Sequence, residues 1–305
     1  MRFFNTAGPV KSNKHYCLEP LERFDTEEIL SLIDQEKYFI LHAPRQTGKT
    51  TCLIELMNHI NDHGKYKCLY CNVEAAQAAK ENIKEGIRTI LNEISTSARI
   101  YLQDTFVMEN WNEILEKSGE NAALNETLTQ WAEASVSPLI LFIDEIDALI
   151  GDTLISVLRQ LRAGYTKRPE MFPQSLILCG VRDIRDYRIH SSKTKEIITG
   201  GSAFNIKAKS FRLGDFSKED VKKLYDIHTR ETGQVFDEEA IELVWKYTQG
   251  QPWLVNAIGY ETVFDIKENR DRSVVITSDM IHRAKENIIL RREAHIDQLV
   301  DKLQE

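Results

Sequence analysis

The amino-acid sequence predicts an α/β fold, in which a parallel sheet flanked by helices precedes an all-helical unit. Three observations carry this prediction. A short apolar strand pattern at 38–41 runs through a glycine-containing loop into an apolar helical pattern. Two further apolar segments, 138–143 and 175–180, suit strands that helices cover on both faces. From residue 215 onward the pattern is helical, with no further strand of any length.

Composition and charge indicate a soluble globular protein. Of its 305 residues, 42% are apolar and 28% are charged. No apolar run approaches the roughly 20 residues of a membrane span, and the start of the chain lacks the apolar segment of a secretory signal. The five cysteines are an odd number and suit reduced, buried thiols. We therefore expect a cytoplasmic protein that does not enter a membrane.

Residues 1–37 are expected to form an N-terminal segment that leads into the candidate site. Asp25 as N-cap, with Glu28 three residues further on, predicts a helix over 26–35. This helix would deliver the chain directly to the first core strand.

The core is expected to span 38–214. Its second strand is predicted at 67–73, where Cys68 and Cys71 form a C-x-x-C pair. An offset of three places two strand residues on opposite faces, so we interpret them as separate core thiols. Residues 74–131 read as helices with charged faces. The later core elements are expected in this order: strand 138–143, helix 152–162, strand 175–180 and a strand-like piece within 204–213. Strands that alternate with helices predict parallel pairing.

A helical lid domain is expected over 215–305. Ser217 to Asp220 has the pattern of a helix cap, and acidic residues outnumber basic ones by nineteen to thirteen from Asp215 onward. The expected helices lie near 218–232, 237–249, 252–268 and 279–304. The last pattern has no Gly or Pro stop, which leaves open whether the natural chain continues past Glu305.

The loop after the first strand is the central motif. It reads Ala43, Pro44, Arg45, Gln46, Thr47, Gly48, Lys49, Thr50 and Thr51. A G-x-x-x-x-G-K-S/T pattern binds phosphate when a strand precedes it and a helix follows. Gly48 would let the backbone close around the phosphates, Lys49 would bring charge to them, and the Thr50 hydroxyl would hold Mg²⁺. Ala43 stands where the first glycine is expected, and an alanine can still end a strand. The alternative is a chance G-K-T in a surface loop.

Two acids follow the apolar strand 138–143. The carboxyl ends of parallel strands share one edge of a sheet, where ligands of such folds bind. In a P-loop NTPase the first acid holds the Mg²⁺ shell, and the second can orient and deprotonate the attacking water. We assign these roles to Asp144 and Glu145. The alternative is that the two acids simply end a strand.

Strand 175–180 is expected between the other two, so that its end faces the γ-phosphate. Arg182 and Arg185 follow it and are candidates for stabilising phosphate charge, in cis or across a subunit boundary. The alternative is a solvated helix start. These arginines belong to a basic segment, 159–195, in which nine Lys and Arg residues face three acids. On a chain of net charge -8, that excess is a candidate surface for nucleic acid or another acidic partner.

The motifs together resemble AAA+ type ATPases. The string Asp144-Glu145-Ile146-Asp147-Ala148-Leu149 is similar to that of origin-recognition-type initiators. The loop A-P-R-Q-x-G-K-S/T more closely resembles the STAND and archaeal-type ATPases, specifically the bacterial AAA-like domain proteins. Arg23 resembles the arginine that this group carries ahead of its P-loop, although the G-R-E form is only partly met. Gly250-Gln251-Pro252 looks like the G-x-P signature of the group's helical lid.

The resemblance implies Mg-ATP binding at the junction of core and lid, with hydrolysis resetting a conformational switch. Arg23 and Pro252 would then contact the nucleotide. The leading hypothesis is an ATPase switch, slow in isolation, that acts with an unidentified protein partner or by self-association. A second hypothesis is a nucleic-acid-associated ATPase resembling replication initiators or transposition helpers. A third, a binding module without hydrolysis, is disfavoured because Lys49, Thr50 and both acids are present.

Overall fold

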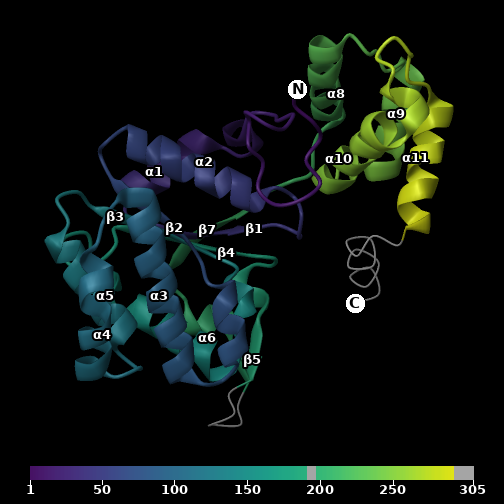
Figure 1. Ribbon diagram of the computed structural model, residues 1–305. Coiled ribbons are helices and arrows are strands. Elements are labelled where there is room, and N and C mark those ends of the chain that lie inside the picture. The colour runs from purple at the N-terminus through teal and green to yellow at the C-terminus, as the bar shows by residue number, and fades with distance from the viewer. Residues whose placement is uncertain (191–196, 292–305) are drawn as a thin grey trace. The chain divides into compact units, whose positions relative to one another are not determined.

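The structure is a computed structural model that describes residues 1–190 and 197–291 (Figure 1). Its contacts divide the chain into two compact units. The sheet unit consists of Leu21–Arg45 and Cys52–Leu213, and the helical unit consists of Met1–Pro20, Gln46–Thr51 and the chain from Gly214 onward. The first 37 residues, expected as one segment, are therefore divided at Pro20 by their contacts.

The sheet unit is built on a parallel sheet with the strand order β2-β3-β4-β1-β7. The strands are β1 (Tyr38–His42), β2 (Lys67–Asn72), β3 (Leu139–Asp144), β4 (Ser175–Gly180) and β7 (Lys207–Arg212). β3 and β4 are buried along their whole length, as their unbroken apolar sequences predict. β4 lies between β1 and β3, so the predicted parallel α/β fold is confirmed.

Helices cover both faces of this sheet, as Figure 1 shows. On one face, α1 (Thr26–Asp34) and α2 (Lys49–Asp62) pack apolar side chains such as Ile29 and Leu53 against the strands. The other face is covered mainly by α3 (Ile83–Leu102), α5 (Ala123–Ala134) and α6 (Gly151–Ala163). The sheet unit also contains short 3₁₀ helices and the elements α4 (Phe106–Ser118), α7 (Gly200–Ala203), β5 (Arg188–His190) and β6 (Ile197–Thr199).

The two cysteines of β2 confirm the expected alternation along the strand. Cys68 belongs to the cluster beneath α2, whereas Cys71 belongs to the cluster beneath α3. Burial raises the pKa of both thiols far above the usual range, because an apolar surrounding disfavours the thiolate. Both side chains are therefore core residues rather than a redox pair.

The helical unit contains α8 (Lys218–Thr232), α9 (Glu238–Thr248), α10 (Pro252–Tyr260) and α11 (Ser278–Leu290). Ser217 caps α8 with a complete capping box to Asp220, as the sequence predicts. The expected single helix 252–268 is instead three successive helical segments. The α-helix α10 is followed by a π-helix (Glu261–Asp265) and a 3₁₀ helix (Lys267–Arg270). The end of the expected helix 279–304 lies outside the described residues.

The N-terminal residues complete the core of the helical unit. Phe4 and Tyr16 are buried to 0% and 1% exposure among side chains of α8 and α10. The Trp253 indole N–H donates to the Thr6 carbonyl at 2.9 Å, and Arg2 pairs with Glu231. This segment is thus an integral part of the helical unit.

In the described part of the chain, no helix has both the length and the apolar character needed to span a membrane.

Candidate functional site

The loop from β1 to α2 has the backbone of a phosphate-binding loop. Gln46 and Gly48 have positive φ angles of 64° and 85°, and α2 begins at Lys49. Alternation of right- and left-handed residues turns successive backbone N–H groups inward, and the helix N-terminus adds a favourable dipole for an anion. Ala43 is buried where it continues the sheet, donating its N–H to the Gly180 carbonyl at 3.1 Å. Its position therefore needs no glycine.

Residues of the helical unit hold the second half of this loop. The Val10 N–H donates to the Thr51 hydroxyl at 3.0 Å, and the Gln251 side-chain amide donates to the Gln46 carbonyl at 3.4 Å. Thr47 and Lys49 are 1% and 7% exposed. The loop is therefore supported by both the N-terminal segment and the first residues of α10.

Asp144 ends β3 with a fully buried, firmly held carboxylate. Its Oδ2 atom accepts a hydrogen bond from the Tyr70 hydroxyl at 3.0 Å, and its Oδ1 atom accepts from the Glu145 backbone N–H at 2.9 Å. Donors on both oxygens fix the plane of the carboxylate. Sequence reasoning missed Tyr70, because only the strand register shows that this tyrosine lies beside the acid.

Glu145 has an unusual backbone conformation. Its φ and ψ angles of 58° and 39° lie in the left-handed region, which costs energy for a residue with a side chain. Such strain persists only where the surroundings impose it, and it concentrates at functional sites. The turn lets the chain leave the sheet edge immediately after Asp144 and places Glu145 at that edge.

The end of β4 is fixed to the same string of acids. The Asp147 carboxylate accepts from the Val181 N–H at 3.2 Å. A Cβ atom at Gly180 would lie 2.7 Å from the same carboxylate, so any larger residue there would displace the Asp147 side chain. The loop after β4 is thereby held against the turn that follows β3.

The two candidate arginines follow this anchored strand end. Arg182 is exposed. Arg185 lies in a 3₁₀ turn, η5 (Ile184–Asp186), and its side chain lies outside what the structure describes. Between them, Asp183 forms a nearly buried ion pair with Lys207 of β7, at 2.6 Å from both carboxylate oxygens. This pair holds the loop to the sheet.

Arg23 lies against the P-loop helix. It ends η1 (Pro20–Arg23) and contacts the thiol of Cys52 in α2. Burial raises the pKa of that thiol to about 11, and the neighbouring guanidinium opposes the increase. Pro252 is the first residue of α10 and is buried in the helical unit, directly after the Gln251 cap.

The basic segment 159–195 is only partly a surface. The Lys167 ammonium donates to Asn125 and Thr129 at 2.9 and 3.1 Å. The Arg168 guanidinium stacks on the rings of Tyr38 and Tyr165 and donates to three backbone carbonyls. The exposed basic residues of the segment are Arg159, Arg162 and Arg182. Arg185 and Arg188 have no described side chains, and Lys193 and Lys195 lie outside the described residues.

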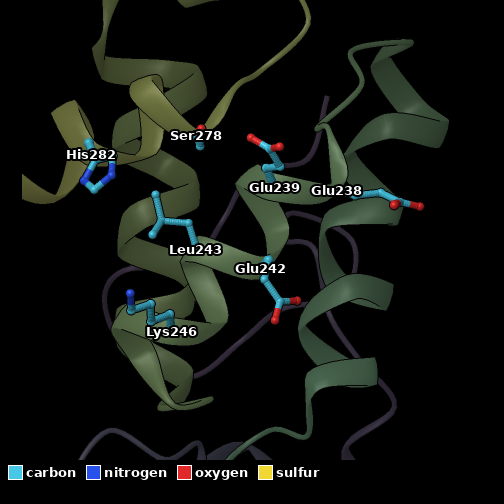
Figure 2. Close-up of a pocket in the computed structure, with 7 residues that line it drawn as sticks. All are labelled: Glu238, Glu239, Glu242, Leu243, Lys246, Ser278 and His282. Carbon is cyan, nitrogen blue, oxygen red and sulfur yellow. The ribbon is translucent and has the colours of Figure 1, made fainter.

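An open groove of about 510 Å³ lies on the helical unit. Figure 2 shows its lining side chains, which come from α9 and the first turns of α11. They are Glu238, Glu239, Glu242, Leu243, Lys246, Ser278 and His282. None of them belongs to the candidate nucleotide site, and the Glu242 carboxylate is already paired with Lys218.

The site residues suit a magnesium ion. Asp144 and Thr50 offer a carboxylate and a hydroxyl oxygen, the ligands that Mg²⁺ prefers. Mg²⁺ commonly uses one or two carboxylates together with substrate phosphates. Within the described ranges, no cluster of three or more His, Cys, Asp or Glu side chains could hold a metal by itself. Taken singly, each of the two side chains is of a type that a nucleotide-bound Mg²⁺ uses.

A phosphate loop after β1 and paired acids after β3, with β4 between these strands, define the fold of a P-loop NTPase. Comparison with known families agrees. The chain belongs to the AAA-like domain family, which it matches over residues 7–270.

Solved structures show the same fold. A Walker-type ATPase of Pyrococcus abyssi superposes with a TM-score of 0.63 and 14% identity, over 99% of this chain and 79% of that one. Cdc6p from Pyrobaculum aerophilum superposes with a TM-score of 0.54 and 15% identity, over 86% of this chain and 65% of that one. Domain III of the Thermotoga maritima replication initiation protein DnaA superposes with a TM-score of 0.51 and 13% identity, over 88% of this chain and 93% of that one. No curated protein matches significantly.

Proposed function

We propose that this chain is a Mg-ATP-binding and ATP-hydrolysing switch. The observation that carries the proposal is the loop backbone, in which positive φ angles at Gln46 and Gly48 immediately precede a helix that begins at Lys49. Such a loop presents N–H groups and a lysine to a polyphosphate. Membership of the AAA-like domain family supports ATP as the nucleotide.

The roles of the site residues follow from their chemistry. The loop Ala43–Thr51 surrounds the phosphates, and Lys49 neutralises their charge. Thr50 and Asp144 hold the Mg²⁺ ion, which supplies electrostatic stabilisation of the transferring phosphoryl group. Glu145 orients the attacking water and accepts its proton. The left-handed backbone of Glu145 supports this assignment, because such conformations concentrate at functional sites.

A substitution pair tests the assignment. Lys49→Ala removes the charge at the phosphates and should abolish ATP binding. Glu145→Gln keeps the size of the side chain but not its basicity, so ATP should bind with parental affinity and remain unhydrolysed. Binding is measured by calorimetry and turnover by phosphate release in the same Mg²⁺ buffer. Parental turnover by the Glu145→Gln protein would show that Glu145 is not the base.

The switch is proposed to be of STAND type, with the helical unit as a lid. The A-P-R-Q-T-G-K-T loop supports that subgroup, and Arg23 and Pro252 are the residues proposed to contact the nucleotide. ATP would close the lid, and the closed form would engage a protein partner or a second copy of the chain. Turnover in isolation should be slow, because a supplied arginine contributes about 10³ to 10⁵ in kcat. Arg182 and Arg185 are the candidates for that arginine.

A nucleic-acid-associated ATPase is the second candidate. The basic residues that remain exposed, Arg159, Arg162 and Arg182, favour it. The structural likeness to a replication initiation protein concerns the fold, and its extension to nucleic-acid binding is part of this proposal. The ATPase rate with and without duplex DNA, measured at several salt concentrations, separates the two candidates, because phosphate contacts weaken steeply as salt increases.

A further inference from the structure

The hydroxyl of Tyr70 is directed at the candidate magnesium ligand by the register of the sheet. Tyr70 of β2 lies opposite Phe142 of β3, and Asn72 lies opposite Asp144. Because alternate strand residues share a face, Tyr70 and Asp144 project from the same side of the sheet. The tyrosine ring is long enough to extend two residues toward the carboxyl edge, where its hydroxyl donates to Asp144 Oδ2 at 3.0 Å.

The surroundings of Tyr70 leave its ring little freedom. Its exposure is 5%, and it belongs to the apolar cluster beneath α2 together with Met57 and Phe142. Tyr101 packs edge-on against it, with the ring centroids 6.3 Å apart. A packed ring places its hydroxyl at a fixed point. The position of that hydroxyl is therefore set by the core rather than by the carboxylate.

We propose that Tyr70 is a positioning residue for the metal–nucleotide complex. Its hydroxyl holds one oxygen of Asp144, the Glu145 N–H holds the other, and the carboxylate is thereby presented to the metal in one orientation. Partners that orient a metal ligand commonly contribute 10- to 100-fold in metal affinity. This inference rests on the proposed function, since it concerns the metal that accompanies ATP.

Tyr70→Phe is the direct test, because it removes the hydroxyl and keeps the ring. Tyr66→Phe is the matched control, since the Tyr66 hydroxyl also donates to an aspartate, Asp34, on the exposed surface of the same unit. ATP affinity is measured by calorimetry over a range of Mg²⁺ concentrations and in EDTA. We expect Tyr70→Phe to raise the half-saturating Mg²⁺ concentration about 10- to 100-fold, with unchanged affinity in EDTA. Tyr66→Phe should match the parent in both conditions.

A second readout follows the metal itself. Mn²⁺ bound to the ATP-loaded protein is counted by electron paramagnetic resonance, and its affinity should fall in Tyr70→Phe by a similar factor. Saturating Mg²⁺ should restore ATP binding to the parental level, which a general loss of packing would not allow.

Three results would overturn the inference. A Mg²⁺ dependence equal to that of the parent would show that the hydroxyl does not act on the metal ligand. An equal loss of affinity in Mg²⁺ and in EDTA would assign the tyrosine to packing alone. A parent protein that binds no ATP would contradict the proposed function itself. If the parent binds Mg-ATP and the Tyr70→Phe protein binds it equally well, only this inference fails.

Discussion

His228 is an ionisable residue enclosed in the core of the helical unit. Its Nδ1 atom faces the Tyr16 hydroxyl and its Nε2 atom faces the Gln234 side-chain oxygen, each at 3.0 Å. Because that oxygen can only accept, the neutral ring carries its proton on Nε2. Burial lowers the pKa of His228 to about 4, and the nearby Arg272 charge acts in the same direction.

This pKa predicts how the stability of the helical unit depends on pH. The unfolded chain takes up a proton near pH 6.5 and the folded chain only near pH 4, so the stability is fully present above pH 6.5 and is lost as the pH falls toward 4. The loss is up to about 3 kcal/mol. Urea midpoints across this range should fall more steeply for the parent than for His228→Gln. The exposed His282→Gln serves as control, and equal slopes in parent and His228→Gln would contradict the prediction.

Single residues are easiest to predict where a motif defines them. Spacing and context predict the P-loop and the two acids after β3, and the strands that precede these motifs, β1 and β3, belong to one parallel sheet. Tyr70 was not predicted, because its contact with Asp144 depends on how β2 and β3 are aligned in the sheet. The charge count over 159–195 could not show that the Arg168 guanidinium lies over the rings of Tyr38 and Tyr165. Composition counts charges, whereas packing decides which of them reach the surface.

At the scale of elements, two glycines that follow helices of the helical unit offer a matched comparison. Gly250 has φ 80°, and a Cβ atom there would lie 2.0 Å from the Phe216 carbonyl oxygen. Gly233 has φ 78° with nothing within 4 Å. Gly233→Ala should therefore lower the free energy of unfolding by about 1 kcal/mol, because only the left-handed backbone conformation is unfavourable for alanine. Gly250→Ala should cost about 2 to 5 kcal/mol, because the turn before α10 must also move.

Chemical denaturation of both variants checks this prediction, with the m-value as a test that the same transition is observed. Equal costs would mean that the turn at Gly250 yields easily. In that case the corner between α9 and α10 would not fix the entry of Pro252 into its helix.

Elements were predicted well where sequence patterns are strong. The apolar strands and the cap at Ser217 agree closely with the structure, because burial on both faces and side-chain capping leave local signatures. The turn types after α10 had no such signature. There the buried Glu261 carboxylate accepts hydrogen bonds from Asn287 and Arg291. Burial raises the pKa of this carboxyl group. An apolar periodicity cannot anticipate a buried carboxylate with partners 26 and 30 residues away.

For the whole molecule, nucleotide binding should be visible as stability. ATP at about 100 times its Kd adds roughly 2.7 kcal/mol by linkage, which raises the Tm by at least about 2 to 4 °C for a chain of this size. If ATP closes the lid, the two units should melt in one transition when Mg-ATP is present. Calorimetric scans with Lys49→Ala as control check this. Separate transitions at saturating Mg-ATP would contradict coupling, even if one of them shifts.

The membership of Phe4 and Tyr16 in the helical unit has a consequence for biosynthesis. Their partners Val221 and Leu224 are made about 200 residues later, since the sheet unit is encoded between the two pieces. At ribosomal rates of about 5–20 residues per second, the packing partners of these aromatic side chains are synthesised roughly 10–40 s after them. During that interval they are exposed apolar surface, a natural target for chaperones. Every strand of the parallel sheet is therefore synthesised before the helices that enclose Phe4 and Tyr16.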